Sequence, residues 1–499
     1  MLWLFTQYLV VGELEIGRIL WYSSCTGALI TVKKISGGGF MENKNLQQRD
    51  GFSSKLGIIA AAAGSAIGLG NIWKFPYITG VYGGGAFILV YLVCIALIGL
   101  PVMLQEFTIG RRAQANAITS FKKLKPNSPW FLTGWLGFAS AFVILSFYGV
   151  VAGWTLSYVF SAITNAFSGQ SPEELNNYFG ALITNPWKPI LFQVIFMALT
   201  AGIILGGVKN GIEKYSKILM PLLLAIIIVL DIRAVTLPGA GAGLAFLFQP
   251  DFGKLTASAV MSALGHAFFS LSLGMGTMIT YGSYISKKEN LGVTALQVTI
   301  ADTAIALLAG LAIFPAVFAF GIEPGAGPGL VFITLPNVFN QMPGGYIFAI
   351  MFFMLLAVAA LTSSISILEV VVAYFVEGKG WDRKKATIIA ASVITALGAF
   401  ESLTNGAVKL TLPLLKGGQV HIFGFFDWMI EMSDLMLPIG GFFITVFVGW
   451  IMSKKDVDDE ITNGGELSHA WAGIFNFLTK FVAPVLIFIT FLNLIFGWF

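Results

Sequence analysis

About eleven apolar stretches, each long enough to cross a lipid bilayer as a helix, dominate this sequence and constrain its fold most strongly. Because backbone polar groups in lipid must be paired within the chain, each stretch is expected to be helical. The composition agrees, since 57% of the residues are hydrophobic and 11% are charged. The sequence therefore predicts an all-α polytopic membrane protein. The stretches lie near residues 56–80, 84–110, 130–163, 189–206, 214–232, 256–285, 291–321, 345–376, 385–403, 423–452 and 470–497.

Lysine and arginine gather at alternate ends of these stretches. Arg49 and Lys55 precede the first one and Lys454 and Lys455 precede the last, whereas the loop 321–345 contains a single charged residue, Glu323. Cytoplasmic loops carry the excess of positive charge in membrane proteins. We therefore expect a cytoplasmic N-terminus.

Several chemistries are poorly supported by the sequence. Its two cysteines and three histidines show no metal-ligand spacing, and no basic run interleaved with aromatic residues would suit a nucleic-acid partner. No arrangement of a nucleophile with a base stands out either, so a membrane-embedded enzyme is a disfavoured alternative. We expect no organic cofactor, no nucleic acid and no obligate protein partner.

Residues 1–40 do not continue the apolar pattern. Their short apolar start is followed by Glu13, Glu15 and Arg18, without the cleavage site of a signal peptide. The run GGGF lies directly before Met41, and glycine codons are rich in G. A bacterial ribosome-binding site translated by mistake would give such a run. We interpret 1–40 as a non-native extension and Met41 as the true start. An additional amphipathic helix is the alternative.

The first apolar stretch contains AAAGSAIGLGNIWKFPYITG, which is unusual for a plain spanning helix. The pair Gly64 and Gly68 alone would indicate close packing of two helices. Gly70 and the amide of Asn71 follow at membrane depth, and glycine weakens a helix. Together these residues favour an unwound segment whose free backbone groups face a ligand cavity.

The sixth stretch has the same character in FFSLSLGMGTMITYG. Serine and threonine commonly bond back to their own helix, but the pair Gly274 and Gly276 at mid-span favours a second break. Interruptions five helices apart are typical of an inverted repeat of helices 1–5 and 6–10, with a binding site between the repeats.

The segments GSAIGLGNIWKFPYITGVYGGGAF, LPVMLQEFTIGRR and FFSLSLGMG resemble the neurotransmitter:sodium symporter family, specifically its bacterial eleven-helix amino-acid transporters. The resemblance extends from about Arg49 to Phe499. It implies the LeuT-type fold, with helices 1 and 6 unwound at mid-membrane, in a bacterial inner (plasma) membrane. The implied segments are a cytoplasmic gate segment 41–55, a first repeat 56–233, a second repeat 234–452, and a loop with helix 11 over 453–499.

The resemblance implies a substrate site at the two breaks. The carboxylate of an amino acid would meet backbone amides of the first break and the Tyr148 hydroxyl, because the positive end of a half-helix favours an anion. Its ammonium would meet carbonyl groups at both breaks, and its side chain a largely apolar wall. A hydrophobic or aromatic amino acid is therefore expected. The implied substrate-binding residues are Ser65, Ala66, Leu69, Gly70, Ile144, Tyr148, Phe269, Ser270, Ser272, Met275, Ser363 and Ile367.

The resemblance also implies two sodium sites, since carbonyl and hydroxyl oxygens suit this hard cation. Asp302 stands where many relatives have asparagine, and an acid at membrane depth is functional by default. Its charge would replace the chloride of animal relatives, which predicts chloride independence; a neutral Asp302 bonded to a neighbouring helix is the alternative. The first site would use Ala66, Asn71, Ser270 and Asp302, and the second Gly64, Ile67, Ala359, Thr362 and Ser363.

Two gates complete the implied transporter. Outside, Lys74 replaces the usual arginine and keeps the charge without bidentate pairing. Its expected partner is Asp427, with Glu431 and Asp434 as alternatives, above a lid of Tyr148 and Phe269. The inside latch would comprise Arg49, Phe52, Tyr284 and Glu377; an ordinary charged cluster at helix ends is the alternative.

Two further features bear on the first helix and on ion release. Glu106 is expected to support the unwound part of helix 1 from behind, or else to reach the cytoplasmic interface. Gly211 and Pro221 are both poor helix-interior residues at the start of the fifth stretch. They mark either a plain helix start or a segment that unwinds to let water reach the second sodium.

These predictions combine into sodium-coupled symport of a hydrophobic or aromatic amino acid by alternating access. The expected partners are the amino acid, two sodium ions and membrane lipid. A sodium-dependent amino-acid sensor that binds without productive transport is the alternative.

Overall fold

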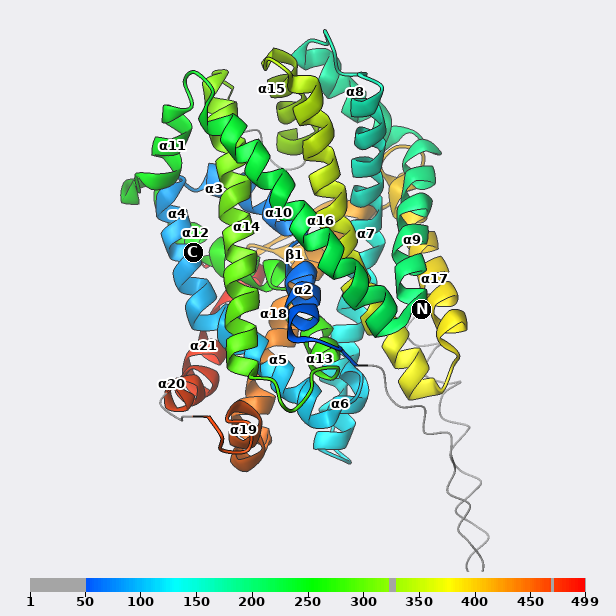
Figure 1. The fold of residues 1–499 in the computed structure, drawn as a ribbon, viewed down its shortest axis with the longest axis vertical. Helices are drawn as coiled ribbons and strands as arrows, with labels where there is room; N and C mark the ends of the chain where they lie inside the picture. Colours follow the sequence, from blue (N-terminus) through cyan, green and yellow to red (C-terminus); the bar gives the residue numbers. More distant parts are fainter. Residues whose placement is uncertain (1–50, 323–328, 468–470, 499) are drawn as a thin grey trace, which may run out of the picture. The chain divides into compact units, whose positions relative to one another are not determined.

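The structure is a computed structural model that describes residues 51–322, 329–467 and 471–498. These residues belong to one compact unit, Asp50–Phe499, which Figure 1 shows as a bundle of helices. The predicted extension 1–40, Met41 and Arg49 lie outside the described residues. The predicted division of the chain into segments and repeats stays a prediction.

The long helices of the first half begin and end close to the predicted apolar stretches, whereas the short helices Ala117–Leu124 and Pro172–Thr184 lie between those stretches. The first begins after Ser54, whose hydroxyl accepts the Gly57 N–H at 3.1 Å, as expected of an N-cap. Wide π-helical turns at Gly70–Lys74, Ile95–Gly99 and Val208–Glu213 lead into α3, α5 and α10. The helices are α2 (Lys55–Ala66), α3 (Phe75–Val81), α4 (Gly85–Cys94), α5 (Leu100–Ala113), α6 (Ala117–Leu124), α7 (Phe131–Ile163), α8 (Pro172–Thr184), α9 (Lys188–Leu205) and α10 (Lys214–Val235).

The second half continues in the same way, with further π-helical turns at Leu330–Thr334, Tyr374–Gly378, Phe447–Ile451 and Leu478–Val482 and a short 3-10 turn at Phe252–Lys254. Its helices are α11 (Gly241–Phe248), α12 (Ala257–Ser270), α13 (Thr277–Gly282), α14 (Leu291–Ala319), α15 (Leu335–Gln341), α16 (Gly345–Ala373), α17 (Arg383–Thr404), α18 (Phe425–Val446), α19 (Lys454–Ile461), α20 (Ala472–Phe477) and α21 (Ala483–Phe496).

One element is not helical. The antiparallel strands β1 (Thr411–Lys416) and β2 (Gln419–Gly424) form a hairpin between α17 and α18. Gly417 and Gly418 turn it with φ of 59° and 76°, which suits a two-residue hairpin turn. This hairpin was not predicted, because its strands are too short to stand out as membrane-spanning stretches. The remainder of the described chain keeps the predicted helical character.

Nine helical segments of the described chain are long and apolar enough to cross a membrane, and a pair bent by 50° at 67–69 would make ten. The helices α12 and α13, with 14 and 6 residues, are each shorter than a span. The predicted count of about eleven therefore requires α12 and α13 to cross together as one broken span.

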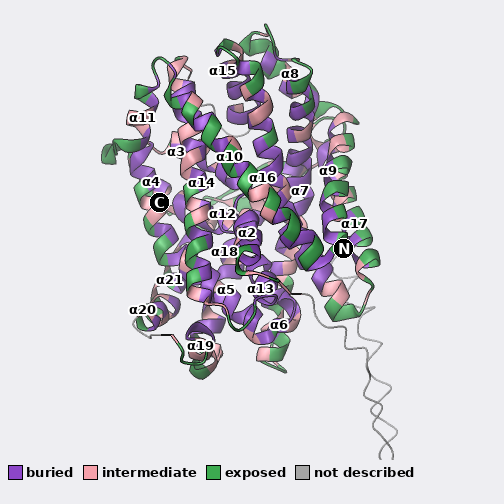
Figure 2. Cartoon of the chain, viewed as in Figure 1, coloured by how far each residue is buried: buried purple, intermediate pink, exposed green. Residues whose placement is uncertain are grey.

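Burial distinguishes central from peripheral helices. Within the most apolar window of each segment, 72% of α7 is buried but only 28% of Val208–Val235. Figure 2 shows buried residues along the middle of the bundle and exposed ones on its outer helices. Exposed apolar side chains such as Ile218 and Ile232 on α10 fit a surface that faces lipid. The helix α2 lies in the interior, in contact with α10, α14 and α16 (Figure 1).

Candidate substrate and ion site

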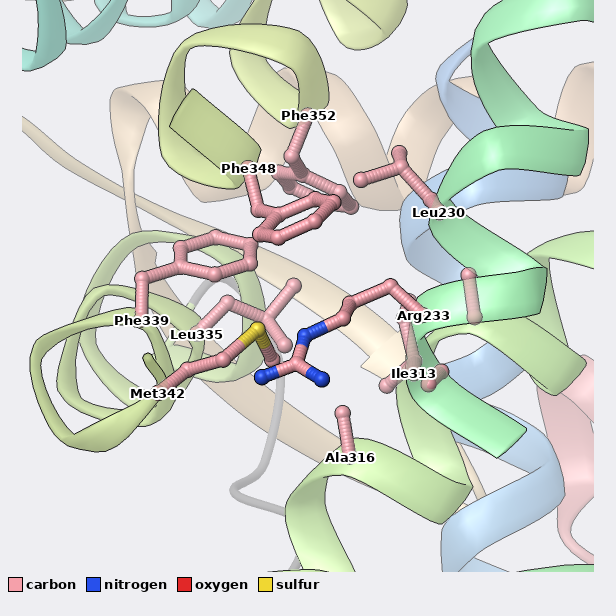
Figure 3. A pocket seen from close by; sticks show the side chains of 11 residues that line it. Leu230, Arg233, Ile313, Ala316, Leu335, Phe339, Met342, Phe348 and Phe352 are labelled. Atoms are coloured by element: carbon pink, nitrogen blue, oxygen red, sulfur yellow. The ribbon is translucent and has the colours of Figure 1, made fainter. Parts of the chain in front are cut away.

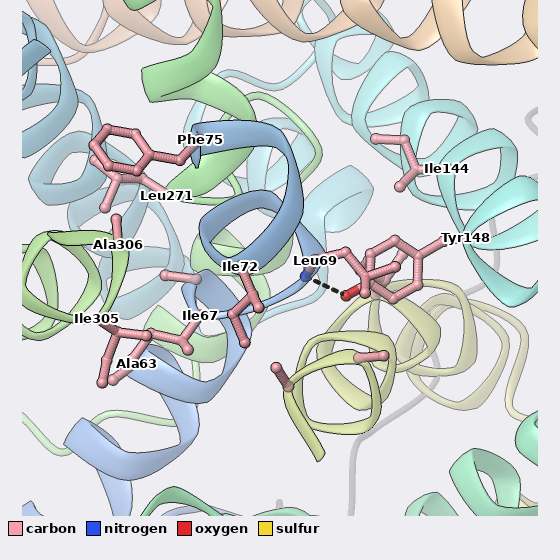
Figure 4. Close-up of a cluster of buried hydrophobic side chains, with 14 of the residues drawn as sticks. Ala63, Ile67, Leu69, Ile72, Phe75, Ile144, Tyr148, Leu271, Ile305 and Ala306 are labelled. Atoms are coloured by element: carbon pink, nitrogen blue, oxygen red, sulfur yellow. Dashed lines mark hydrogen bonds between the residues drawn. The ribbon is translucent and has the colours of Figure 1, made fainter. Parts of the chain in front are cut away.

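The first break follows α2. At Ile67 the backbone becomes extended, with φ of −74° and ψ of 103°, and helical geometry resumes at Gly70. Two amides of the break are paired with side chains: Gly68 N–H donates to Asn71 Oδ1 at 3.0 Å, and Leu69 N–H to the Tyr148 hydroxyl at 3.1 Å. Figure 4 shows this second bond beside Ile144, on the same helix as Tyr148. Side chains thus replace the missing helical partners.

The second break separates α12 from α13. Ser272, Gly274 and Gly276 all have positive φ, of 54°, 81° and 78°, a conformation that is costly for the serine. A Cβ on Gly274 would lie 2.3 Å from the Leu437 carbonyl oxygen of α18, so glycine is required there. Ser272 Oγ donates to the Ser65 carbonyl at 2.9 Å, which joins the two breaks.

Glu106 on α5 is fully buried and contacts the second break. Its Oε1 accepts the Gly274 N–H at 2.7 Å. The prediction placed this carboxylate behind the first break, because the sequence did not indicate which break faces α5. The structure corrects that position: α5 packs against α13, and Glu106 supplies a partner to an amide that a continuous helix would have paired.

A cavity lies where the two breaks meet α7 and α16. The residues predicted to bind substrate line it, except Ser65 and Ser270. Ser65 Oγ instead donates to Ser366 Oγ at 2.7 Å, and Ser270 turns toward Asp302. The lining comprises Ala66, Gly68, Leu69, Gly70, Ile144, Tyr148, Phe269, Ser272, Met275, Ser363 and Ile367.

Gly68 lines the cavity but was not among the predicted substrate-binding residues. A Cβ at this position would lie 2.8 Å from Tyr148 Oη and 3.0 Å from Ser363 Cβ. Glycine is therefore the residue that lets Tyr148 and α16 approach the first break. The Gly64-x-x-x-Gly68 spacing had been noted only as a packing pattern.

The predicted first sodium site is a connected group of oxygen-bearing side chains. Asn71 Nδ2 donates to Asp302 Oδ1 at 2.7 Å, and Ser270 Oγ donates to Asp302 Oδ2 at 3.0 Å. All three side chains are buried, and Ala66 lies nearby in the cavity wall. A carboxylate with hydroxyl and carbonyl oxygens is a hard donor set that fits sodium.

The predicted second sodium site is also brought together. Thr362 Oγ1 lies 3.0 Å from the Ala359 carbonyl oxygen and 3.5 Å from that of Ile67. A Cβ on Gly64 would lie 3.3 Å from Thr362 Cβ, and one on Gly68 would lie 3.1 Å from Ser363 Oγ. The Ile67 carbonyl of the first break therefore faces the Thr362 hydroxyl of α16, again a donor set suited to a monovalent cation.

The ion pair at Lys74 involves Asp434. Lys74 Nζ lies 3.0 Å from both Asp434 oxygens, and 4.6 Å from the centroid of the Phe269 ring. The first choice of partner, Asp427, was wrong: it is exposed in the first turn of α18, seven residues before the acid that faces Lys74. Glu431 pairs with Lys416 at 2.6 Å. The sequence could not fix where α18 begins, because the preceding hairpin was not predicted.

At the opposite end of the bundle, Phe52 packs edge-on against Tyr284, with ring centroids 6.1 Å apart. The Tyr284 hydroxyl donates to Glu369 Oε1 at 2.8 Å, and Arg383 Nη2 lies 2.5 Å from Glu369 Oε2. Glu369 was not predicted, although an acid in SISILEVVVAYF is as unusual at membrane depth as Asp302. The predicted Glu377 accepts the Asn116 N–H at 2.7 Å at the start of α6, and Arg49 lies outside the described residues.

The segment between Gly211 and Pro221 is helical throughout. Gly211 lies in the π-helical turn before α10, and Pro221 is inside that helix. A Cβ on Gly211 would lie 2.1 Å from the Ile203 carbonyl oxygen, which accounts for the glycine. The release role of this spacing stays a prediction.

A second cavity lies between α10, α14, α15 and α16. Figure 3 shows the Arg233 side chain reaching into it beside Phe339, Phe348 and Met342. Arg233 Nη2 donates to the Pro343 carbonyl at 3.1 Å. Because neither broken helix lines this cavity, it offers no freed backbone groups for an amino acid and is not the candidate substrate site.

Comparisons with known proteins agree with this geometry. The model of the sodium:neurotransmitter symporter family matches residues 49–178 and 184–498. An uncharacterised sodium-dependent transporter of Bacillus subtilis, YhdH, is 42% identical over 89% of this chain and 97% of its own length. A second uncharacterised sodium-dependent transporter, from Haemophilus influenzae, is 37% identical over 91% of this chain and 99% of its own.

A solved structure is also similar. The crystal structure of MhsT in complex with L-phenylalanine superposes with a TM-score of 0.81 at 47% identity, covering 89% of this chain and 99% of that one. The sodium- and chloride-dependent GABA transporter 2 of the rat is 27% identical over 84% of this chain and 76% of its own length. The chain belongs to the sodium:neurotransmitter symporter family.

Proposed function

We propose that this chain carries a hydrophobic or aromatic L-amino acid into the cell together with sodium, by alternating access. The observation that carries the proposal is the cavity at the two helix breaks. Its wall contains Ile144, Met275, Phe269 and Ile367, which suit an apolar side chain, while the breaks supply polar backbone groups for the amino and carboxyl ends. The similar crystal structure of MhsT in complex with L-phenylalanine supports the same class of substrate.

The substrate carboxylate is proposed to bind at the first break, beside the Leu69 amide and the Tyr148 hydroxyl, which now bond to each other at 3.1 Å. A carboxylate there would accept from both groups and would lie at the positive end of the half-helix that begins at Gly70. The ammonium is proposed to meet carbonyl oxygens of Ala66 and of the second break. This arrangement recognises the part common to all α-amino acids, and the apolar wall selects among side chains.

Two sodium ions are the proposed co-transported cargo. One would bind at the Ala66 carbonyl, Asn71, Ser270 and Asp302, and the other at Gly64, Ile67, Ala359, Thr362 and Ser363. Both groups include residues at or beside the first break, so ion binding and substrate binding would order the same segments. Sodium moving inward down a potential of about 100 mV releases about 2.3 kcal/mol per charge, enough for accumulation of tens-fold from one ion.

Chloride independence is proposed because Asp302 places a negative charge beside the first ion site. Its carboxylate accepts hydrogen bonds from Asn71 and Ser270. A carboxylate held in this way already supplies the charge that chloride would supply next to a neutral residue.

The two gates are proposed to open alternately, in a multi-pass protein of the bacterial plasma membrane with its N-terminus in the cytoplasm. Lys74 and Asp434 would close the outer path above Phe269. Phe52, Tyr284 and Glu369 would close the inner path, since they fasten the start of α2 to α13 and α16. Sodium and substrate can drive this change only by binding one state more tightly than the other.

The test is uptake of labelled amino acids by the full-length chain in proteoliposomes, with sodium or potassium outside and chloride or gluconate as anion. We expect sodium-dependent accumulation of an apolar or aromatic amino acid, unchanged in gluconate. Asn71→Ala should abolish it, while Gly202→Ala, which adds a methyl with nothing within 4 Å, should not. Sodium-dependent binding without accumulation would identify a sensor, and uptake that requires chloride would refute the role given to Asp302.

A further inference from the structure

Glu401 on α17 is a fully buried acid outside the proposed substrate and ion sites. Its Oε1 lies 2.7 Å from Ser146 Oγ on α7. Its Oε2 is buried and has no hydrogen-bond partner within the described part of the chain, and no lysine or arginine there is paired with it. An ionised carboxylate in such surroundings is very costly, so acids at membrane depth are normally paired or functional.

The hydroxyl of Ser146 has two acceptors within reach. Ser146 Oγ lies 2.7 Å from the Val143 carbonyl oxygen as well as 2.7 Å from Glu401 Oε1. A serine hydroxyl has one proton, which is shared between these acceptors or given to one of them. Within the described residues the Glu401 carboxyl therefore has a single hydroxyl as its polar side-chain partner, which is far less than an ionised carboxylate needs when it is buried.

Within the described residues, no charged group on the neighbouring elements compensates a charge on Glu401. The helix α7 has no Asp, Glu, Lys, Arg or His between Phe131 and Ile163. On the other elements that pack against α17, the charged residues lie near helix ends or are paired elsewhere, as Asp434 is with Lys74 and Glu431 with Lys416. The other charged residues on these elements make no contact with Glu401 among the described residues. They are Lys188 on α9, Glu173 and Glu174 on α8, Glu369 and Glu377 around the end of α16, and Asp427 on α18.

The contact lies where α7, α9 and α17 approach one another closely. A Cβ on Gly398 of α17 would lie 2.4 Å from the Ser146 carbonyl oxygen and 2.2 Å from Gln193 Nε2 of α9. A Cβ on Gly153 of α7 would lie 2.7 Å from the Gln193 backbone nitrogen. Because α7 packs closely against α17 here, a rearrangement around an ionised Glu401 would displace α7 rather than be absorbed locally.

Ser146 is directly behind the substrate-lining face of α7. Ile144 and Tyr148 both line the cavity, and Ser146 lies between them in sequence. Two residues along a helix correspond to a rotation of about 200°, so Ser146 points away from the cavity. The position of the Tyr148 hydroxyl against Leu69 therefore depends on how α7 is seated on α17.

We propose that Glu401 is held as a neutral carboxylic acid and is a positioning residue, which seats α7 so that Ile144 and Tyr148 face the substrate. Loss of the proton would leave an ionised carboxylate buried with a single hydroxyl donor, which would disturb the packing of α17 on α7 and weaken substrate binding. The packing of α7 on α17 at Glu401 follows from the geometry of these two helices. The effect of Glu401 on substrate binding rests on the proposed function.

The protonation state is measured first, because it needs no substrate. Infrared spectra of the full-length chain and of Glu401→Gln in lipid, at neutral pH in light and heavy water, should differ by the carbonyl band of one protonated carboxylic acid. Glu173→Gln, which removes an exposed carboxylate of α8, should leave that band in place. Identical spectra for the parent and Glu401→Gln would overturn the proposal.

The positioning role is measured by equilibrium binding of labelled L-phenylalanine in sodium across alkaline pH. The glutamine amide can still donate to Ser146 but cannot ionise, so Glu401→Gln should bind within about twofold of the parent at neutral pH. As pH rises, the parent should weaken relative to Glu401→Gln by up to about tenfold per pH unit, and Glu173→Gln should follow the parent. Glu401→Ala lacks the donor and should bind at least about tenfold more weakly at every pH.

The outcomes separate the two proposals. The positioning role would be overturned if the affinity of the parent and that of Glu401→Gln changed with pH in the same way. It would also be overturned if Glu401→Gln, as folded protein, bound L-phenylalanine as weakly as Glu401→Ala. If the parent does not bind L-phenylalanine while the infrared band is present, the substrate assignment fails and the neutral acid stands.

Discussion

Replacing Gly68 by alanine tests whether the cavity at the breaks is the substrate site. The added methyl would lie 2.8 Å from Tyr148 Oη and 3.0 Å from Ser363 Cβ, both closer than carbon normally approaches. Overpacking of this kind costs about 1–3 kcal/mol, and part of it would be met by pushing the Tyr148 hydroxyl away from Leu69 N–H. We therefore expect substrate affinity to fall by about 5- to 150-fold.

A double-mutant cycle assigns that loss to the Tyr148 hydroxyl. Tyr148→Phe alone removes one hydrogen bond to Leu69, which is worth about 1 kcal/mol, but also removes the oxygen that the new methyl would meet. The double variant should therefore lose at least about 0.5 kcal/mol less than the sum of the single variants. Equilibrium binding of labelled L-phenylalanine in sodium measures all four proteins, and Gly202→Ala on the surface of α9 is the matched control.

Two results would refute this reasoning. Binding by Gly68→Ala within twofold of the parent would mean that the methyl meets no fixed neighbour, and so that the cavity is not arranged as described. Strictly additive losses in the cycle would mean that the methyl acts without touching the Tyr148 hydroxyl.

Other variants probe the ion site and the two gates. Asp302→Asn should raise the sodium concentration for half-maximal uptake by about 10- to 100-fold. Added chloride should partly restore uptake by this variant. If the sodium titration of the variant in gluconate equals that of the parent, the role given to Asp302 is contradicted. Asp434→Asn breaks a pair that is 27% and 31% exposed, so KM should change by less than about fivefold and the change should shrink at high salt. A larger, salt-independent effect would show that the pair does more than close the path. Glu369→Gln removes a buried charge opposite Arg383, and breaking such a pair typically costs about 3–5 kcal/mol of stability. The Tm of this variant in detergent should therefore fall well below that of Glu173→Gln. Equal Tm values would count against a role of Glu369 in closing the inner path.

Much of the fold followed from the sequence, because spanning helices are long and apolar. The predicted stretches 130–163 and 291–321 correspond to α7 (Phe131–Ile163) and α14 (Leu291–Ala319). The breaks were also readable, since Gly70 with Asn71, and Gly274 with Gly276, are poor choices for a continuous helix in lipid. Outside the apolar stretches this signal ends, and the hairpin Thr411–Gly424 was missed.

The parts of the site that sequence could not supply depend on which faces meet in space. Choosing Asp434 over Asp427 required the start of α18, which the missed hairpin determines. Placing Glu106 against Gly274 required the packing of α5 on α13. Glu369 and Glu401 carry a signal that could have found them, because each is an acid within an apolar stretch, but their partners on other helices are set only by tertiary packing.

The central claim is that the sodium gradient drives accumulation of an amino acid, and one measurement tests it most directly. Proteoliposomes containing the full-length chain are loaded with potassium, placed in sodium with labelled L-phenylalanine, and then treated with a sodium ionophore at the plateau. The account predicts an internal concentration above the external one that collapses to equality when the sodium gradient is dissipated. Label that only equilibrates across the membrane, or that stays above equality after the gradient is gone, would contradict sodium-coupled symport.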